Sequence, residues 1–120
     1  QELYLELCNT KGDFMTRLTD DKIRNAAVAV GVTAVQAALQ VQTGQRKSLV
    51  ITNTSTSGQI ITIATGEQAV TSLAGIVLYP GGSWSESLDS AYVPSNLEYW
   101  AISSAASGTI AIQERIIPRL

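Results

Sequence analysis

Four carboxylates in the second half of the chain are the side chains whose type and spacing could support catalysis. Glu86, Asp89, Glu98 and Glu114 lie in or near segments with strand-like sequence. A pair of carboxylates flanking a sugar bond is the usual machinery of glycosidases, so a glycosidase-like enzyme acting through Glu86 or Glu98 is one alternative. The favoured interpretation is that these residues face outward from strands, because charged side chains keep a neutral surface soluble and discourage strand edges from pairing.

The absence of histidine restricts the chemistry further. Histidine is the usual general base for serine and cysteine nucleophiles and the commonest metal ligand. Asp13, Asp20 and Asp21 lack the alternating ligand spacing of a calcium loop, and Pro80-Gly81-Gly82 lacks the lysine and the helix of a phosphate-binding loop. We therefore expect no metal and no cofactor, and we predict that the chain is not an enzyme.

Five aromatic residues are candidates for a ligand platform or a subunit interface. Aromatic rings pack against the apolar faces of sugars while their polar tips tolerate water, so a carbohydrate-binding module or adhesin-like domain using Trp84 and Trp100 is a second alternative. Because large aromatic residues are few, we expect at least one of these tryptophans in the core. The five candidates are Trp84, Trp100, Tyr79, Tyr92 and Tyr99.

Composition limits the kinds of partner. Charged residues make up 15% of the 120 residues and the net charge is −2, so no nucleic-acid partner is expected, because phosphate binding depends on Lys and Arg. The apolar run over residues 26–32 is shorter than the ~20 residues of a membrane span, and no membrane partner is expected. The single cysteine, Cys8, cannot form an internal disulfide, and we interpret it as a buried core thiol.

Alternating and β-branched runs predict seven strands in an all-β protein. The turn Tyr79-Pro80-Gly81-Gly82 has the proline and glycine that a type II turn requires. Strands spaced in this way by turn residues predict a single antiparallel β-sandwich or a jelly-roll-like barrel, with an N-terminal arm or short helix. The predicted strands lie near residues 35–42, 48–52, 59–65, 75–79, 83–88, 98–103 and 109–115.

The first quarter of the chain carries half of its charged residues and differs from the neutral body. Thr19 or Asp20 can cap a helix, which predicts a short helix over residues 19–28. We expect residues 1–30 to form an arm or assembly segment and residues 31–120 to form the sandwich. The residues of the arm expected to make assembly contacts are Leu3, Leu5, Leu7, Phe14, Arg17 and Arg24.

Several motifs follow one another in a recognisable order. A basic residue opens the strand Arg46-Lys47-Ser48-Leu49-Val50-Ile51-Thr52-Asn53, the turn segment Gly75-Ile76-Val77-Leu78-Tyr79-Pro80-Gly81-Gly82 follows, and Tyr99-Trp100-Ala101-Ile102 comes late. Over residues 46–114 this order resembles small β-sandwich virion proteins of tailed bacteriophages and related viruses, which decorate capsids or form head fibres.

The resemblance implies a non-catalytic virion structural protein that acts by oligomeric assembly. Its expected partners are copies of itself and other virion proteins such as the major capsid protein, and a carbohydrate partner stays open. The expected location is the virion, assembled in the host cytoplasm, or otherwise outside cells. The N-terminal arm would then reach a neighbouring subunit.

Overall fold

The computed structural model describes residues 22–66 and 70–117, which form eight β-strands and no helix. Each of the seven strands expected from the sequence is present, and the all-β fold class is confirmed. One more strand precedes them. The strands are β1 (Lys22–Val30), β2 (Val35–Ala38), β3 (Gln45–Asn53), β4 (Ile61–Thr65), β5 (Ile76–Leu78), β6 (Ser83–Ser87), β7 (Tyr99–Ser103) and β8 (Gly108–Ile117).

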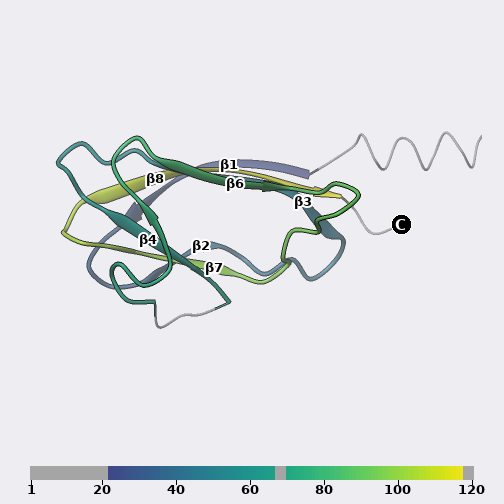
Figure 1. Ribbon diagram of the computed structural model, residues 1–120, viewed down its shortest axis with the longest axis horizontal. Coiled ribbons are helices and arrows are strands. Elements are labelled where there is room, and N and C mark those ends of the chain that lie inside the picture. The colour runs from purple at the N-terminus through teal and green to yellow at the C-terminus, as the bar shows by residue number, and fades with distance from the viewer. Residues whose placement is uncertain (1–21, 67–69, 118–120) are drawn as a thin grey trace, which may run out of the picture.

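Two four-stranded antiparallel sheets form the two layers seen in Figure 1. One sheet has the order β1-β8-β3-β6 and the other has the order β2-β7-β4-β5. The paired strands β1 and β8, β2 and β7, β3 and β6, and β4 and β5 are nested as in one long hairpin. Winding such a hairpin into two sheets gives the jelly-roll topology.

The first strand corrects the prediction of a helix over residues 19–28. Within the described part of that range, the backbone is extended, and β1 pairs with β8 in nine consecutive residue pairs. Val28 and Val30 favour a strand, and a full ladder with β8 outweighs the charges that could cap a helix. The first sheet therefore includes residues that precede position 31, where we expected the sandwich to begin.

The core lies between the inner faces of the two sheets. Alternate residues of each strand point inward, and the buried side chains include Leu49, Ile51, Ile63 and Ile110, all 0% exposed. Each such burial contributes about 1.5–3 kcal/mol to folding. Packing of these apolar side chains therefore fixes the two sheets relative to each other.

The predicted turn after β5 is confirmed. Gly81 has φ of 82°, and the backbone N–H of Gly82 donates to the carbonyl of Tyr79 at 2.7 Å. The same turn is held to β3, because the N–H of Gly81 donates to the carbonyl of Asn53 at 2.8 Å. The buried amide of Asn53 also donates to the carbonyls of Gln59 and Leu78, both at 2.8 Å, and so fixes the loops at this end of the sandwich.

Candidate functional site

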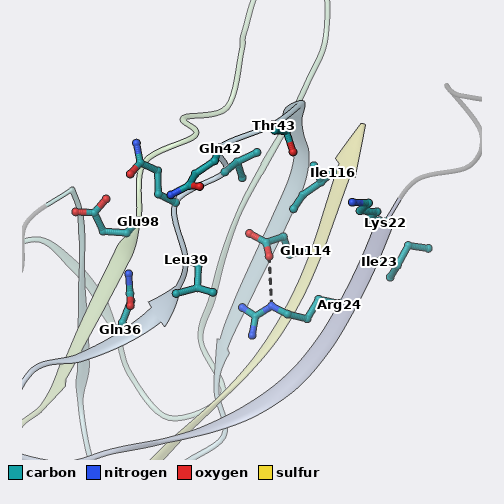
Figure 2. A pocket seen from close by; sticks show the side chains of 12 residues that line it. Lys22, Ile23, Arg24, Gln36, Leu39, Gln42, Thr43, Glu98, Glu114 and Ile116 are labelled. Atoms are coloured by element: carbon teal, nitrogen blue, oxygen red, sulfur yellow. Dashed lines mark hydrogen bonds and ion pairs between the residues drawn. The ribbon is translucent and has the colours of Figure 1, made fainter. Parts of the chain in front are cut away.

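A groove of 740 Å³ lies between the start of β1 and residues 36–43, which include the end of β2. We call it the β1 groove. Figure 2 shows Arg24 and Glu114 projecting into the space beside Leu39, whereas Ile23 points away from it. Its lining combines the apolar residues Ile23, Leu39, Val41 and Ile116 with the charged residues Lys22, Arg24, Glu98 and Glu114, and with four polar residues from the 36–43 wall.

An ionic triad joins the two walls of this groove. Glu114, on β8, accepts from Nε of Arg24 at 3.3 Å through one carboxylate oxygen and from Nε of Arg46 at 2.8 Å through the other. Arg24 also donates to the carbonyl of Ala37 at 3.1 Å, and Arg46 donates to the carbonyl of Leu39 at 2.9 Å. The two guanidinium groups thus tie the 36–43 wall to the first sheet.

Arg46 is the most buried member of the triad, and its side chain is 0% exposed. It donates to the carbonyls of Ser95 and Leu97 as well as to Leu39. Its own backbone N–H donates to the side chain of Asn96 at 2.8 Å. A buried charge is costly unless it is paired and hydrogen-bonded, and here every part of the guanidinium group has a partner.

A second buried carboxylate, Glu86 on β6, accepts hydrogen bonds from the phenols of Tyr92 and Tyr99. Burial first, and then the hydrogen bond to Glu86, raises the pKa of Tyr99 above its usual value. The hydrogen bond to Glu86 also raises the pKa of Tyr92. Both phenols therefore act as donors at neutral pH, and Tyr92 fastens the loop that precedes β7.

The four carboxylates do not all face outward as we expected. Glu86 and Glu114 are 8% and 4% exposed and point between the sheets, because their positions on β6 and β8 are both in register with the buried residue Leu49. Asp89 is exposed and accepts the backbone N–H groups of Ala91 and Tyr92. The expectation of outward-facing side chains is therefore wrong for the two strand carboxylates.

The aromatic candidates do not gather into one platform. Trp84 packs inward, with its ring centroid 5.7 Å from that of Tyr99. Trp100 lies on the other sheet, next along β7 from the inward-facing Tyr99, so it points to the opposite face. Tyr79 and Tyr92 are 62% and 47% exposed. We expected at least one tryptophan in the core, and Trp84 is partly buried and packs against the core.

Trp100 has one further feature. Its indole Nε1 is buried and has no hydrogen-bond partner in the described part of the chain. Its cross-strand neighbours are Gln36 and Ala64.

Most of the expected arm lies outside the described residues. This applies to Leu3, Leu5, Leu7, Phe14 and Arg17, and also to Cys8 and the acidic residues before position 22. Arg24 is described, and it belongs to β1 and to the ionic triad.

The described residues hold neither a cluster suited to a metal ion nor a helix suited to a membrane. Across residues 22–66 and 70–117, no group of three or more Cys, Asp or Glu side chains is placed to hold a metal ion. No helix in this part has the length and apolar character to cross a bilayer.

The sequence reasoning missed Leu39 and Arg46 as residues of the site. Strict alternation along β3 places Leu49, Ile51 and Asn53 on the inner face and therefore predicts that Arg46 points outward. A shift of register between Arg46 and Ser48 reverses the face and turns the guanidinium group inward. A basic residue beside a strand that otherwise alternates is the only local signal of this arrangement.

No protein-family model and no curated protein matches the sequence. Among solved structures, the fold is similar to that of a chain from Bacillus endospore appendages, which form a family of disulfide-linked pili. The TM-score is 0.51 and the sequence identity is 16%, over 82% of this chain and 87% of that chain. At this identity the similarity concerns the fold.

Proposed function

We propose that this chain is a non-catalytic structural protein that associates with copies of itself in an extracellular or particle-bound assembly. The observation that carries the proposal is the edge strand β1. It is nine residues long, and from Asn25 to Val30 it contains no charged residue, proline or bulge. Proteins usually protect a long edge by such features, since an unprotected edge is a template for pairing with another chain.

The outer face of the same sheet supports the proposal. Ala27, Ala111, Thr52 and Ser83 are cross-strand neighbours in one row across all four strands. These side chains are small and uncharged, so another copy can approach along this row without burying a charge.

The placement of the carboxylates favours a structural role over the glycosidase alternative. Both oxygens of Glu114 are occupied by Arg24 and Arg46, and both oxygens of Glu86 are occupied by tyrosine phenols. Carboxylates held in this way stabilise the packing of the two sheets, whereas a general acid or nucleophile must reach a substrate.

The similarity in fold to a pilus protein and the resemblance in sequence to phage proteins both support a role in assembly. The fold neighbour belongs to disulfide-linked pili, which is an instance of a similar fold in an assembled fibre. The resemblance to phage proteins supports a position on a virion, with the major capsid protein as a further partner. A virion component and a surface appendage share the same physical requirement, a folded unit with exposed faces that other copies cover.

Sedimentation velocity of the full chain over a range of concentrations tests the proposal. We expect oligomers for the natural sequence. The double variant Ala27→Lys/Ala29→Lys places charges on β1 and should shift the protein to monomers, with an unchanged circular dichroism spectrum. The matched control Ala105→Lys/Ala106→Lys changes exposed loop residues and should assemble like the natural sequence. A protein that stays monomeric at every concentration would overturn the proposal.

A further inference from the structure

The β1 groove exposes apolar side chains beside an edge of β1 that no other described strand pairs with. Leu39 is 70% exposed in the groove, and Val41 and Ile116 are partly exposed beside it. Ile23 is 52% exposed at the rim of the groove, opposite Arg115, and its side chain points to the outer face of the sheet. An apolar patch rimmed by polar and charged groups marks a surface that another molecule covers. The ionic triad beneath it keeps the 36–43 wall in place, so the groove is formed before anything binds.

The first 21 residues of the chain have the chemistry to fill this groove. Leu3, Leu5 and Leu7 alternate with more polar residues, so an extended backbone would present them on one face. The segment contains five acidic and two basic residues, a net charge of −3. The groove lining has no net charge, because Lys22 and Arg24 are balanced by Glu98 and Glu114, and Arg24 is paired with Glu114. The exposed cation Lys22, at the β1 end of the groove, is the group that can attract the acidic segment.

We propose that the β1 groove of one copy binds the N-terminal segment of a second copy, with Leu3, Leu5 and Leu7 packed against Leu39 and its apolar neighbours. This inference rests on the proposed self-association and names the contact that produces it. The segment would lie where β1 begins, next to the edge that no other described strand pairs with. A bound strand there can also pair with the backbone of β1, which is a common mode of peptide recognition.

The N-terminal segment is long enough to reach the groove of a neighbouring copy. The segment leaves the folded part at Lys22, which itself lines the groove. An extended chain spans about 3.3 Å per residue, so 21 residues reach up to ~70 Å and can enter a neighbouring molecule. Because each copy has one segment and one groove, the contact is heterologous and builds open chains or closed rings.

Complementation between two full-length variants tests the contact. The groove variant is Leu39→Asp, at a side chain exposed enough that the core is unaffected. The segment variant is Leu3→Ser/Leu5→Ser/Leu7→Ser. Each variant alone lacks one half of the contact and should sediment as a monomer. An equimolar mixture contains one working groove and one working segment and should give a heterodimer that grows no further.

The matched control for the groove is Leu73→Asp, at a leucine that is 61% exposed and is not part of the groove. It should assemble like the natural sequence, whereas Leu39→Asp should weaken association by roughly tenfold or more, equivalent to at least ~1.4 kcal/mol. Circular dichroism of every variant should match the natural protein.

The outcomes separate the two proposals. A natural sequence that never associates overturns the proposed function. Association that persists unchanged in Leu39→Asp overturns the groove contact and leaves the proposed function standing. Two monomeric variants that form no heterodimer on mixing also overturn the contact between copies, and they indicate instead that each segment occupies the groove of its own chain.

Discussion

The guanidinium carbon of Arg46 lies 5.0 Å from the centre of the Tyr99 ring, and this contact joins the two sheets. Arg46 belongs to β3 and Tyr99 to β7, so a cation and an aromatic face meet across the sandwich. Each also donates a hydrogen bond to a buried carboxylate, Arg46 to Glu114 and Tyr99 to Glu86. The core therefore contains one connected polar network whose members all have partners.

Replacing Arg46 by Met should lower the free energy of unfolding by about 3–5 kcal/mol. The substitution removes the donors to Glu114 and to three backbone carbonyls and leaves buried acceptors unpaired. Arg46→Lys should recover only part of the loss, because an ammonium group cannot reproduce the planar arrangement of donors on the guanidinium group. Urea unfolding followed by circular dichroism measures both effects.

The control for this experiment is Arg115→Met, one residue beyond Glu114 on the outward side of β8. An exposed substitution of this kind should change the free energy of unfolding by less than about 0.5 kcal/mol. Equal losses in Arg46→Met and Arg115→Met would show that the buried network does not stabilise the sandwich.

The free energy of unfolding should fall as the pH rises above about 10, the pKa of an unperturbed tyrosine. The pKa of Tyr99 is raised in the folded protein by burial and by its bond to Glu86. Its contribution is therefore complete below pH ~10 and is lost as the pH rises toward the folded pKa, since only the unfolded chain releases the proton there. In Tyr99→Phe the slope of the free energy of unfolding against pH should be shallower by up to ~1.4 kcal/mol per pH unit.

Tyr92→Phe is the matched comparison for the pH series, because Tyr92 donates to the other oxygen of Glu86 but is much more exposed. Tyr92→Phe should change the slope of the free energy of unfolding against pH less than Tyr99→Phe does. Unfolding curves recorded from pH 8 to above pH 10 for the natural sequence and both variants provide the measurement, and identical slopes for Tyr99→Phe and the natural protein would contradict the prediction.

Gly108→Ala should destabilise the protein by about 1–3 kcal/mol, because it overpacks the start of β8. A Cβ atom at position 108 would lie 2.8 Å from the carbonyl oxygen of Val30, 2.8 Å from the hydroxyl of Ser103 and 2.9 Å from Cδ1 of Ile61. Gly31→Ala is the control, since nothing lies within 4 Å of its added Cβ. Thermal unfolding compares the two, and a similar melting temperature would argue against close packing at Gly108.

Tryptophan emission tests the carbohydrate alternative one residue at a time. In Trp100→Phe the remaining Trp84 faces the core beside Tyr99, so its emission should not respond to added oligosaccharides. In Trp84→Phe the remaining Trp100 reports on the outer face of the second sheet, and we expect no response there either. A saturable shift in the second variant would establish a sugar site at Trp100.

Local sequence was sufficient to predict the later strands and their turns. The alternation from Val35 onward and the turn at Tyr79-Pro80-Gly81-Gly82 depend on neighbours a few residues apart, and the structure confirms both. The same local reasoning predicted a helix where β1 lies. The segment forms a strand because it pairs with β8, which is distant in the sequence. Arg24 of β1 and Glu114 of β8 are 90 positions apart, and a pattern over a few neighbouring residues cannot predict such a contact.

By itself, the sequence determined an all-β, neutral-surfaced sandwich, because side-chain alternation and turn chemistry act over short distances. Only the tertiary structure decided which charged groups turn inward. A bulge at the start of β3 places Arg46 on the inner face, and pairing with Leu49 places Glu86 and Glu114 there. Burying those charges is favourable only when all partners are present together, and that condition belongs to the assembled fold.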